Sequence, residues 1–348
     1  MEAEAASGKG EKWKSGRSKF EVNVLVAIHH RVAAWTIPLA HVDELRRRFP
    51  HVNFLHSHDR DSDVALAPTA DVAFALGLSK DAVEHAARLR WLHCSAHAVG
   101  HFPLADLAAK DVLVTNSRGI QSTPIAEHVM GGLLALARRL PQSLRRQGEH
   151  AWLPNELVGD AGPWLISGKT MGIIGLGTLG QAIAMRAKAF GMRVVGMRRN
   201  PDREAPAGVD EVIGRSDLDR MLKAADVIVL AAPWTAGTDQ ILDAAAIAKM
   251  KRTAIVMNVA RGQLVDESAL ATALSLGRIG GAVLDVFTLE PLPTTSPFWS
   301  MPNVIITPHT AGFRAGHFDA VIDLFAENLR RFEQGSTLLN VVDLKVGY

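Results

Sequence analysis

The sequence predicts an α/β protein built from two doubly wound parallel-sheet domains. Short apolar runs alternate with helical stretches in two separate series, and a glycine-rich motif follows the first apolar run of the second series. Alternation of this kind favours right-handed crossovers and a parallel sheet with helices on both faces. With 348 residues, 48% of them hydrophobic, the chain is long enough to form two separate cores.

Charge and cysteine content narrow the functional classes. The 38 basic and 36 acidic residues nearly cancel, so we expect no nucleic-acid partner and no membrane partner, and a small molecule fits better. Cys94 is the single cysteine, which excludes an internal disulfide and favours a reducing, cytoplasmic location. The uncharged segment Thr170–Met185 is interrupted by glycines, and Met1–Lys19 lacks a secretory apolar region, so we expect a flexible leader there.

The first series of apolar runs begins at Val22. Helical stretches such as Leu39–Arg48 and Asp81–Leu89 separate its members, as expected for crossovers between parallel strands. The predicted strands are Val22–Ile28, Val52–Leu55, Asp71–Leu76, Leu92–Ala96 and Val112–Asn116.

The second series follows a predicted helix. Ser122 and Thr123 are candidate caps before Pro124, and the apolar body Ile125–Leu140 ends before Pro141. Six predicted strands come next, a number that matches a dinucleotide-binding fold. They are Lys169–Ile174, Met192–Met197, Val227–Ala232, Thr253–Val259, Ala282–Phe287 and Val304–Thr307.

A glycine-rich loop is the strongest single indication of a cofactor. The segment Gly175-Leu176-Gly177-Thr178-Leu179-Gly180 is a GxGxxG motif that follows a predicted strand and opens the helix Thr178–Phe190, which Gly191 ends. Close backbone approach to a pyrophosphate at a helix N-terminus requires glycine in such a loop. We therefore expect Gly175, Gly177, Thr178, Leu179 and Gly180 to bind a dinucleotide, although the motif alone is weak evidence.

These features predict the domain organisation. Residues 118–312 form the dinucleotide-binding domain, and residues 20–117 form the substrate domain after a leader at residues 1–19. The helix Gly316–Gln334 lies beyond the second series, so residues 313–348 are expected to return to the substrate domain. Two crossings, near Asn116 and Thr310, predict a hinge and an interdomain cleft.

The residues after the next strand indicate which nucleotide binds. About twenty residues beyond the loop, where NAD enzymes carry an acid that binds the ribose 2′-hydroxyl, this chain has Arg198 and Arg199. Guanidinium groups bind a 2′-phosphate through charge-assisted hydrogen bonds, whereas a carboxylate would repel it. The sequence therefore predicts a preference for NADPH, with NADH still possible. The alternative is that both arginines are simply solvated.

Three predicted strands near the C-terminus are each followed by a different polar residue. Arg261, Glu290 and His309 come after the last three apolar runs, and parallel strands would bring all three to one carboxyl edge. Each residue has an ordinary alternative, namely a loop cation, a turn residue or a structural histidine. Their combination behind a dinucleotide motif predicts an active site.

The segments around these residues resemble the D-isomer-specific 2-hydroxyacid dehydrogenases, in particular the NADPH-preferring glyoxylate/hydroxypyruvate reductases. The resemblance extends over about Val22 to Val342, and its motifs include Asn258–Gly262, Asp285–Pro291, Thr307–Gly312 and Pro233–Thr238. It implies a flavodoxin-like substrate domain, a Rossmann domain and a homodimer. It also implies cofactor contacts at Pro233, Thr238, Val259 and Ala260, and a position near the nicotinamide carboxamide for Asp285, whose alternative role is a strand-end hydrogen bonder.

In that family the residue matching Arg261 binds and polarises a 2-oxo acid, the match of His309 is the general acid/base, and the match of Glu290 is its partner. The chemistry supports these residue types independently. Reduction of a carbonyl needs a hydride and a proton, and an imidazole supplies protons near neutral pH. A nearby carboxylate favours the imidazolium, and a guanidinium matches a substrate carboxylate.

The resemblance also implies a substrate-binding segment in the first domain. Trp91–Gly100 is similar to the family segment whose backbone amides hold the substrate carboxylate, so Ala98 and Val99 are expected to bind it. Ala98 occupies a usual glycine position, and Gly100 replaces the usual acid, so the loop is expected to differ in shape. Trp91 and Cys94 are expected in the core.

Several histidines in the first domain raise the question of a metal site, but their spacing does not match a known set of metal ligands. His29, His30, His51, His56 and His58 lack a ligand set with acids or cysteines at fixed spacing, so no metal site is expected. His29 and His30 follow the first predicted strand, which makes them candidates for selecting the substrate.

The sequence thus predicts an oxidoreductase that transfers hydride between NAD(P)H and carbon 2 of a small 2-oxo or D-2-hydroxy acid. Two alternatives remain open. One is a dehydrogenase for another small acid, such as formate or phosphoglycerate. The other is a nucleotide-sensing protein like the corepressors that resemble this family.

Overall fold

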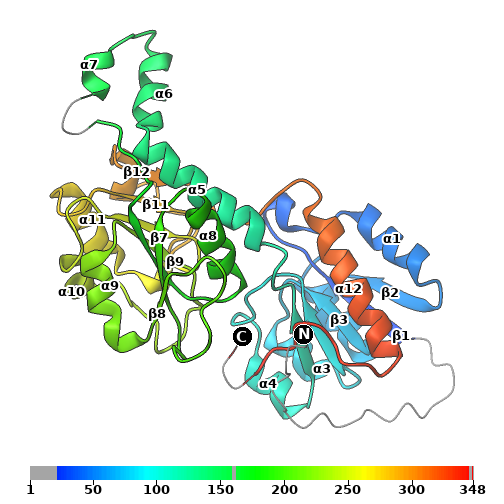
Figure 1. The fold of residues 1–348 in the computed structure, drawn as a ribbon. Coiled ribbons are helices and arrows are strands. Elements are labelled where there is room, and N and C mark those ends of the chain that lie inside the picture. The colour runs from blue at the N-terminus through cyan, green and yellow to red at the C-terminus, as the bar shows by residue number, and fades with distance from the viewer. Residues whose placement is uncertain (1–21, 159–161, 345–346, 348) are drawn as a thin grey trace. The chain divides into compact units, whose positions relative to one another are not determined.

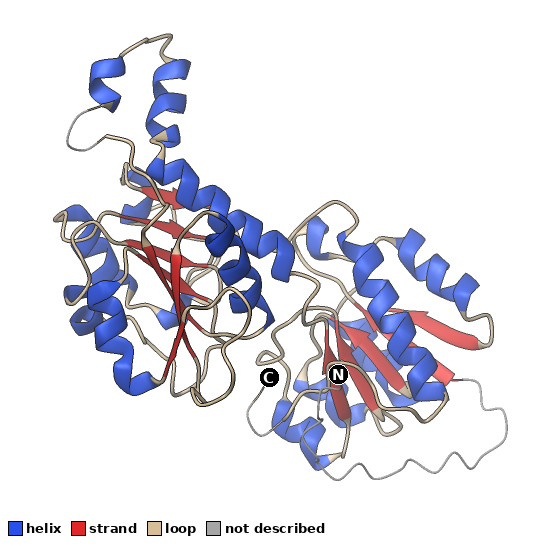
Figure 2. Ribbon diagram, viewed as in Figure 1, coloured by secondary structure: helices blue, strands red, loops and turns tan. Residues whose placement is uncertain are grey.

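The computed structural model describes residues 22–158, 162–344 and 347, so the expected leader at residues 1–19 lies outside the described residues. The chain divides into two units, one ending at Ile120 and resuming at Ala315, the other comprising Gln121–Arg314. Each unit contains one parallel sheet with helices on both faces, which confirms the predicted fold class (Figures 1 and 2). The cleft between the units stays a prediction.

The first unit contains a five-stranded sheet in the order β2-β1-β3-β4-β5, the flavodoxin-like order. Every neighbouring pair is parallel. The strands are β1 (Val22–Ala27), β2 (Val52–His56), β3 (Val72–Ala75), β4 (Trp91–Cys94) and β5 (Leu113–Asn116). The helices are α1 (Leu39–Arg48), α2 (Arg60–Leu66), α3 (Lys80–His85), α4 (Leu104–Ala109) and α12 (His317–Glu333).

Helix α12 belongs to the core of this unit although it comes from the end of the chain. With α1 it covers one face of the sheet (Figure 1). Phe325 stacks on Phe74 with ring centroids 4.1 Å apart, and lies 5.3 Å from Trp91. Burial of three large aromatic rings contributes several kcal/mol, so the last helix is a structural part of the first sheet's core.

The second unit contains a seven-stranded parallel sheet in the order β12-β11-β10-β9-β6-β7-β8. Helices α5 and α8 pack together on one face, and α9, α10 and α11 cover the other. The strands are β6 (Thr170–Ile174), β7 (Arg193–Met197), β8 (Glu211–Ile213), β9 (Val227–Leu230), β10 (Ile255–Asn258), β11 (Gly281–Leu284) and β12 (Val304–Ile306). The helices are α5 (Ser122–Ala137), α6 (Leu140–Gly148), α7 (Pro154–Leu157), α8 (Thr178–Ala189), α9 (Leu218–Ala224), α10 (Ala244–Ala248) and α11 (Glu267–Ser275).

Two details of this unit differ from the sequence prediction. Strand β8 is a seventh strand at the sheet edge, and its three residues form no apolar run long enough to predict it. Ser122 is not a cap but the first residue of α5, with Gln121 as the N-cap residue, and its hydroxyl bonds Thr178 Oγ1 at 3.3 Å. Among the described residues no helix is long and apolar enough to cross a membrane.

Four buried polar side chains of the first unit form a hydrogen-bonded network around His93. Thr115 Oγ1 accepts a hydrogen bond from Trp91 Nε1 at 2.8 Å and lies 2.7 Å from His93 Nδ1, while Ser117 Oγ lies 3.3 Å from His93 Nε2. The Ser117 hydroxyl donates to the Cys94 carbonyl, so it accepts from His93 Nε2–H, and Thr115 donates to Nδ1. With neutral His93, each of these hydrogen bonds has one donor and one acceptor. A second proton, on Nδ1, would face the Thr115 hydroxyl that donates to this nitrogen, and the hydrogen bond would be lost.

This network predicts an acid-sensitive core. Complete burial lowers the pKa of His93 to about 3 from 6.5, so between these values the unfolded chain binds a proton that the folded chain does not. Stability therefore falls as pH decreases, by about 2 kcal/mol from pH 7 to pH 5 for this residue alone. Urea unfolding at the two pH values measures the change. A His93→Gln variant should lose less on acidification; an equal loss would contradict the assignment.

Candidate active site

The glycine loop between β6 and α8 has the backbone that close approach of a nucleotide requires. Gly175 has a φ of +105°, and a Cβ there would lie 2.6 Å from the amide nitrogen of Ala232. A Cβ on Gly180 would lie 1.9 Å from the Gly175 carbonyl oxygen, so helix and strand pack directly. A Cβ on Gly177 would contact nothing within 4 Å, which leaves open space at the start of the helix.

The N-terminus of α8 can accept an anion. Gly177 is its N-cap residue and provides no side-chain cap, and no acidic residue lies in the first turn formed by Thr178, Leu179 and Gly180. Amides at the start of a twelve-residue helix attract negative charge. A pyrophosphate-binding loop needs one glycine for a tight turn, one that lets the phosphate approach the backbone, and one that allows close packing of helix and strand. Gly175, Gly177 and Gly180 meet these three requirements in that order. The residues present therefore fit a dinucleotide.

Other predicted cofactor residues follow neighbouring strands of the same sheet. Arg198 and Arg199 come directly after β7, and the Arg198 guanidinium donates to the carbonyls of Asn200 and Glu204, at 3.0 and 2.9 Å, and of Arg203. After β9, Thr238 Oγ1 donates to the Pro233 carbonyl at 2.7 Å. These contacts fix both loops at the carboxyl edge. Val259 and Ala260 occupy the same edge after β10.

Arg261 follows β10 in a segment that is fixed by the side chain of Asn258. Asn258 Nδ2 donates to the Arg261 carbonyl at 2.9 Å, and Asn258 Oδ1 accepts from the Ala260 amide at 3.1 Å. At Gly262 a Cβ would lie 2.1 Å from the carbonyl carbon of Phe287, so this segment packs against the backbone that follows β11. Asn258 and Gly262 therefore position Arg261 beside the segment that carries Glu290.

His309 and Glu290 form the central contact of the site. His309 Nδ1 lies 2.7 Å from Glu290 Oε2, and the second carboxylate oxygen accepts from the Phe287 amide at 2.9 Å. The two side chains are 37% and 31% exposed, so the pair is accessible to a small molecule. Glu290 is thus held at both oxygens, and the imidazole is oriented by one of them.

The electrostatics of this pair determine where the proton lies. Partial burial would raise the pKa of Glu290, but hydrogen bonds from His309 and Phe287, with the charges of His309 and Arg261, hold that pKa below its ordinary value. Glu290 is therefore ionised near neutral pH and only accepts hydrogen bonds. His309 must carry a proton on Nδ1, which assigns Nε2 to exchange with a ligand.

Asp285 secures the loop that carries His309. Its side chain is buried, and its Oδ1 accepts from Thr307 Oγ1 at 2.5 Å, from the Thr310 amide at 2.9 Å and from the Ala311 amide at 3.2 Å. Its carbonyl accepts from the His309 amide at 2.9 Å. His309 has a φ of +56°, an unusual value for a side-chain-bearing residue that these bonds hold in place. Asp285 is thus a strand-end hydrogen bonder; its predicted nicotinamide contact stays a prediction.

Two residues of this network were not identified from the sequence. Thr307 gives its only hydroxyl proton to Asp285, so it accepts from His128 Nε2, which lies 3.2 Å away on α5. The sequence carries no spacing signal that joins His128 to Thr307, because 179 residues separate them. The contact connects α5 to the end of β12.

Ala98 and Val99 lie in the first unit, after β4, and not in the unit that contains His309. The segment is held by Asn116 Nδ2, which donates to the His97 carbonyl at 2.6 Å, and by the Cys94 thiol, which lies 3.5 Å from the Ala98 carbonyl. Val99 is buried and Ala98 half-buried. Cys94 therefore shapes the loop from within the core, and Trp91, at the start of the same strand, is buried as expected.

Among the described residues, the histidines of the first unit belong to no group arranged like a metal centre. Across residues 22–158, 162–344 and 347, no group of three histidine, cysteine or acidic side chains has the arrangement of a metal site. His51 instead pairs with Glu333 at 2.7 Å, and His29 with Asp63 at 3.0 Å.

Comparison with known proteins identifies the family. Residues 130–311 match the model of the D-isomer specific 2-hydroxyacid dehydrogenase NAD-binding domain. A glyoxylate reductase from Thermococcus gammatolerans is 35% identical over 325 residues, which cover 89% of this chain and 95% of that protein. A D-3-phosphoglycerate dehydrogenase from Methanocaldococcus jannaschii is 34% identical over 82% of this chain but only 52% of its own length.

A solved structure agrees with the whole architecture. It is an NADPH-dependent glyoxylate/hydroxypyruvate reductase from Sinorhizobium meliloti in complex with NADP and sulfate, 28% identical with a TM-score of 0.80. The similarity covers 94% of this chain and all of that chain. With its two parallel sheets and its NAD-binding domain, this chain belongs to the D-isomer specific 2-hydroxyacid dehydrogenase family of oxidoreductases.

Proposed function

We propose that this chain reduces small 2-oxo acids with NADPH and that His309 is the proton donor. The observation that carries the proposal is the His309–Glu290 contact, on the same sheet edge as Arg261 and the Gly175 loop. A bound nicotinamide would supply the hydride to carbon 2 of the acid. An acid, its carboxylate partner, a guanidinium and an anion-accepting helix end satisfy the requirements of that reaction.

Each residue has a separate task in this proposal. Nε2–H of His309 gives its proton to the substrate oxygen as the carbonyl becomes a hydroxyl, which leaves a neutral imidazole. Ionised Glu290 accepts from Nδ1–H, so it fixes the orientation of the ring and leaves Nε2 to face the substrate. Arg261 stabilises negative charge on the carbonyl oxygen and binds the carboxylate. In the reverse direction His309 accepts the proton of a D-2-hydroxy acid.

The substrate carboxylate is assigned to the backbone amides near Ala98 and Val99. The bonds from Asn116 and Cys94 hold this segment in a defined shape, which a carboxylate-binding loop needs. Ala98 presents little side chain to obstruct a small acid.

We infer the preference for NADPH from Arg198 and Arg199. Both follow β7, the strand whose end meets the adenosine ribose in dinucleotide-binding sheets. The bonds from Arg198 to its own loop hold the guanidinium in place beside that strand end. A positioned guanidinium loses less entropy on binding a 2′-phosphate than a mobile one does.

A homodimer is part of the proposal, as is a cytoplasmic location. Helices α6 and α7 project from the second unit (Figure 1). This projecting pair carries exposed apolar side chains, with Trp152 93% exposed and Leu144 65% exposed. Large apolar groups at this degree of exposure favour contact with a second copy. The single buried cysteine, Cys94, is compatible with a reducing compartment.

Turnover measurements test the function. NADPH oxidation, followed by the fall in nicotinamide absorbance, should occur with at least one of glyoxylate, hydroxypyruvate, pyruvate and phenylpyruvate. The kcat/KM with NADPH should exceed that with NADH. Nucleotide binding without turnover of any acid would favour a nucleotide sensor, and a preference for NADH would contradict the role of Arg198.

The glycine loop gives a prediction with an internal control. Gly177→Ala adds a methyl group in open space, so it should fold normally but weaken NADPH binding about tenfold or more by obstructing the pyrophosphate. Gly180→Ala places its methyl group against the Gly175 carbonyl, so it should lower the free energy of unfolding by about 1–3 kcal/mol. Nucleotide titration and urea unfolding separate the two effects. Equal losses in both variants would show that Gly177 has only a structural role.

A further inference from the structure

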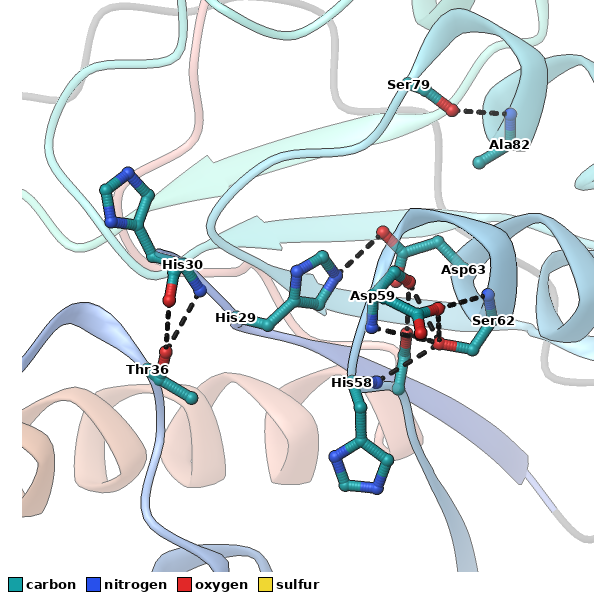
Figure 3. A network of polar contacts seen from close by, with 10 residues as sticks. His29, His30, Thr36, His58, Asp59, Ser62, Asp63, Ser79 and Ala82 are labelled. Atoms are coloured by element: carbon teal, nitrogen blue, oxygen red, sulfur yellow. Dashed lines mark hydrogen bonds and ion pairs between the residues drawn. The ribbon is translucent and has the colours of Figure 1, made fainter. Parts of the chain in front are cut away.

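The first unit contains a second imidazole–carboxylate pair that the proposed reaction does not use. His29 Nε2 lies 3.0 Å from Asp63 Oδ2 (Figure 3). The His29 side chain is 20% exposed and that of Asp63 is 2% exposed. The imidazole therefore separates a buried carboxylate from the surface.

The local sequence places these two residues together. His29 is the second residue after β1, and Asp63 lies in the first turns of α2, which follows β2. Asp59 and Ser62 form a capping box at the start of α2, and the Ser57 amide bonds the Val26 carbonyl at 2.9 Å. Figure 3 shows the capping residues beside the pair. The helix start, and with it Asp63, is thus fixed against the end of β1.

The pair is poorly explained by stability alone. Asp63 Oδ1 is buried and has no hydrogen-bond partner within the described residues. An unsatisfied buried polar atom costs about 1–3 kcal/mol. Apolar residues in place of a buried ion pair are often equally stable or more stable, so stability alone does not explain why this pair is present.

The second ring nitrogen of His29 is available for a ligand. Asp63 Oδ2 engages Nε2, and no described residue pairs with Nδ1. The neighbouring imidazoles add little charge near neutral pH. Burial lowers the pKa of His30, helped by the charge of Arg31, and lowers the pKa of His56, helped by His58. His29 thus presents a polar nitrogen beside neighbouring imidazoles that carry little charge near neutral pH.

Its position in the sheet is the place where such folds bind ligands. The chain passes from β1 to β2 on one side and then to β3 on the other, so the strand order reverses between β1 and β3. Ligands of open α/β sheets bind outside the carboxyl ends of the strands at this point. The segment with Ala98 and Val99 follows β4, on the same edge.

We propose that His29, held by Asp63, binds an oxygen substituent on carbon 3 of the 2-oxo acid. An unprotonated Nδ1 accepts a hydrogen bond from a hydroxyl, whereas a protonated Nδ1 donates one to a carboxylate. The inference rests on the proposed function and narrows its substrate class to acids with a polar side chain. Strands β1 and β4 are two strand spacings apart, about 10 Å. A three- or four-carbon acid can bind near Val99 with its carboxylate and extend toward β1. The His29 imidazole, reaching from the β1 side, covers the rest of the distance between the two strands.

The test compares matched acids. We measure kcat/KM for hydroxypyruvate relative to pyruvate, and for oxaloacetate relative to 2-oxobutyrate, in the wild type and in His29→Gln. Glutamine places its amide where Nε2 was, so it can retain the Asp63 contact while Nδ1 is lost. At least one ratio should fall about tenfold, because a site built to hydrogen-bond a substituent discriminates strongly against its absence. The ratio that falls identifies hydroxyl or carboxylate.

His51→Gln is the matched control. His51 also pairs with a carboxylate, Glu333, but it precedes β2 and lies at the opposite edge of the same sheet, so both ratios should be unchanged. Unchanged ratios in His29→Gln, or an equal loss for all four acids, would overturn the inference and leave the proposed function intact. Wild-type protein that reduces none of these acids, nor glyoxylate, would overturn both.

Discussion

The hydrogen bonds to the buried carboxylate of Asp285 are the interactions on which the site depends. Asp285 ends β11, and its oxygens bind a hydroxyl and two amides of the loop that follows β12. The same loop holds His309 at a positive φ. Without this acceptor, the Thr307 hydroxyl and the amides of Thr310 and Ala311 would lose their partner, and the imidazole would lose its fixed position relative to Glu290.

The parallel pairing of neighbouring strands brings the residues of the site to one edge of the sheet. Because β10, β11 and β12 are neighbours in register, residues that lie far apart along the chain reach one edge: Arg261, Glu290 and His309. The backbone at Gly262 then permits the first two segments to approach each other closely. Against the effect of partial burial, hydrogen bonds from His309 and the Phe287 amide lower the pKa of Glu290, and the charges of His309 and Arg261 add to them. The order of the strands therefore determines both the positions of these three side chains and the charges that act on Glu290.

Much of this arrangement could be predicted from the sequence, for identifiable reasons. Buried parallel strands are apolar runs, the glycine loop is a local motif, and helix α12 is bounded by Gly316 and Gln334 as expected. The edge strand β8 was missed because three residues, two of them half-buried and one buried, are too few to show a strand pattern in the sequence. The predicted cap at Ser122 or Thr123 was wrong because α5 already begins at Ser122, so that both residues lie inside the helix and Gln121 is the N-cap residue.

Long-range side-chain contacts were beyond prediction. The bond between His128 and Thr307 and the pair of His29 with Asp63 join residues from different elements, and no local pattern marks either. Likewise, Arg198 was recognised as a cation, but its bonds to loop carbonyls depend on how the chain turns after β7. Sequence reasoning identified the types of residue in the site; the fold determines which of them interact.

The most direct measurement compares chemistry with nucleotide binding in a His309→Ala variant. If His309 donates the proton, the single-turnover rate of NADPH oxidation with a saturating 2-oxo acid should fall by about 10²–10⁴-fold. The Kd for NADPH, measured by fluorescence titration, should stay within about twofold, because the task of His309 belongs to the transition state. An undiminished rate, or an equal loss of rate and nucleotide affinity, would contradict the central claim.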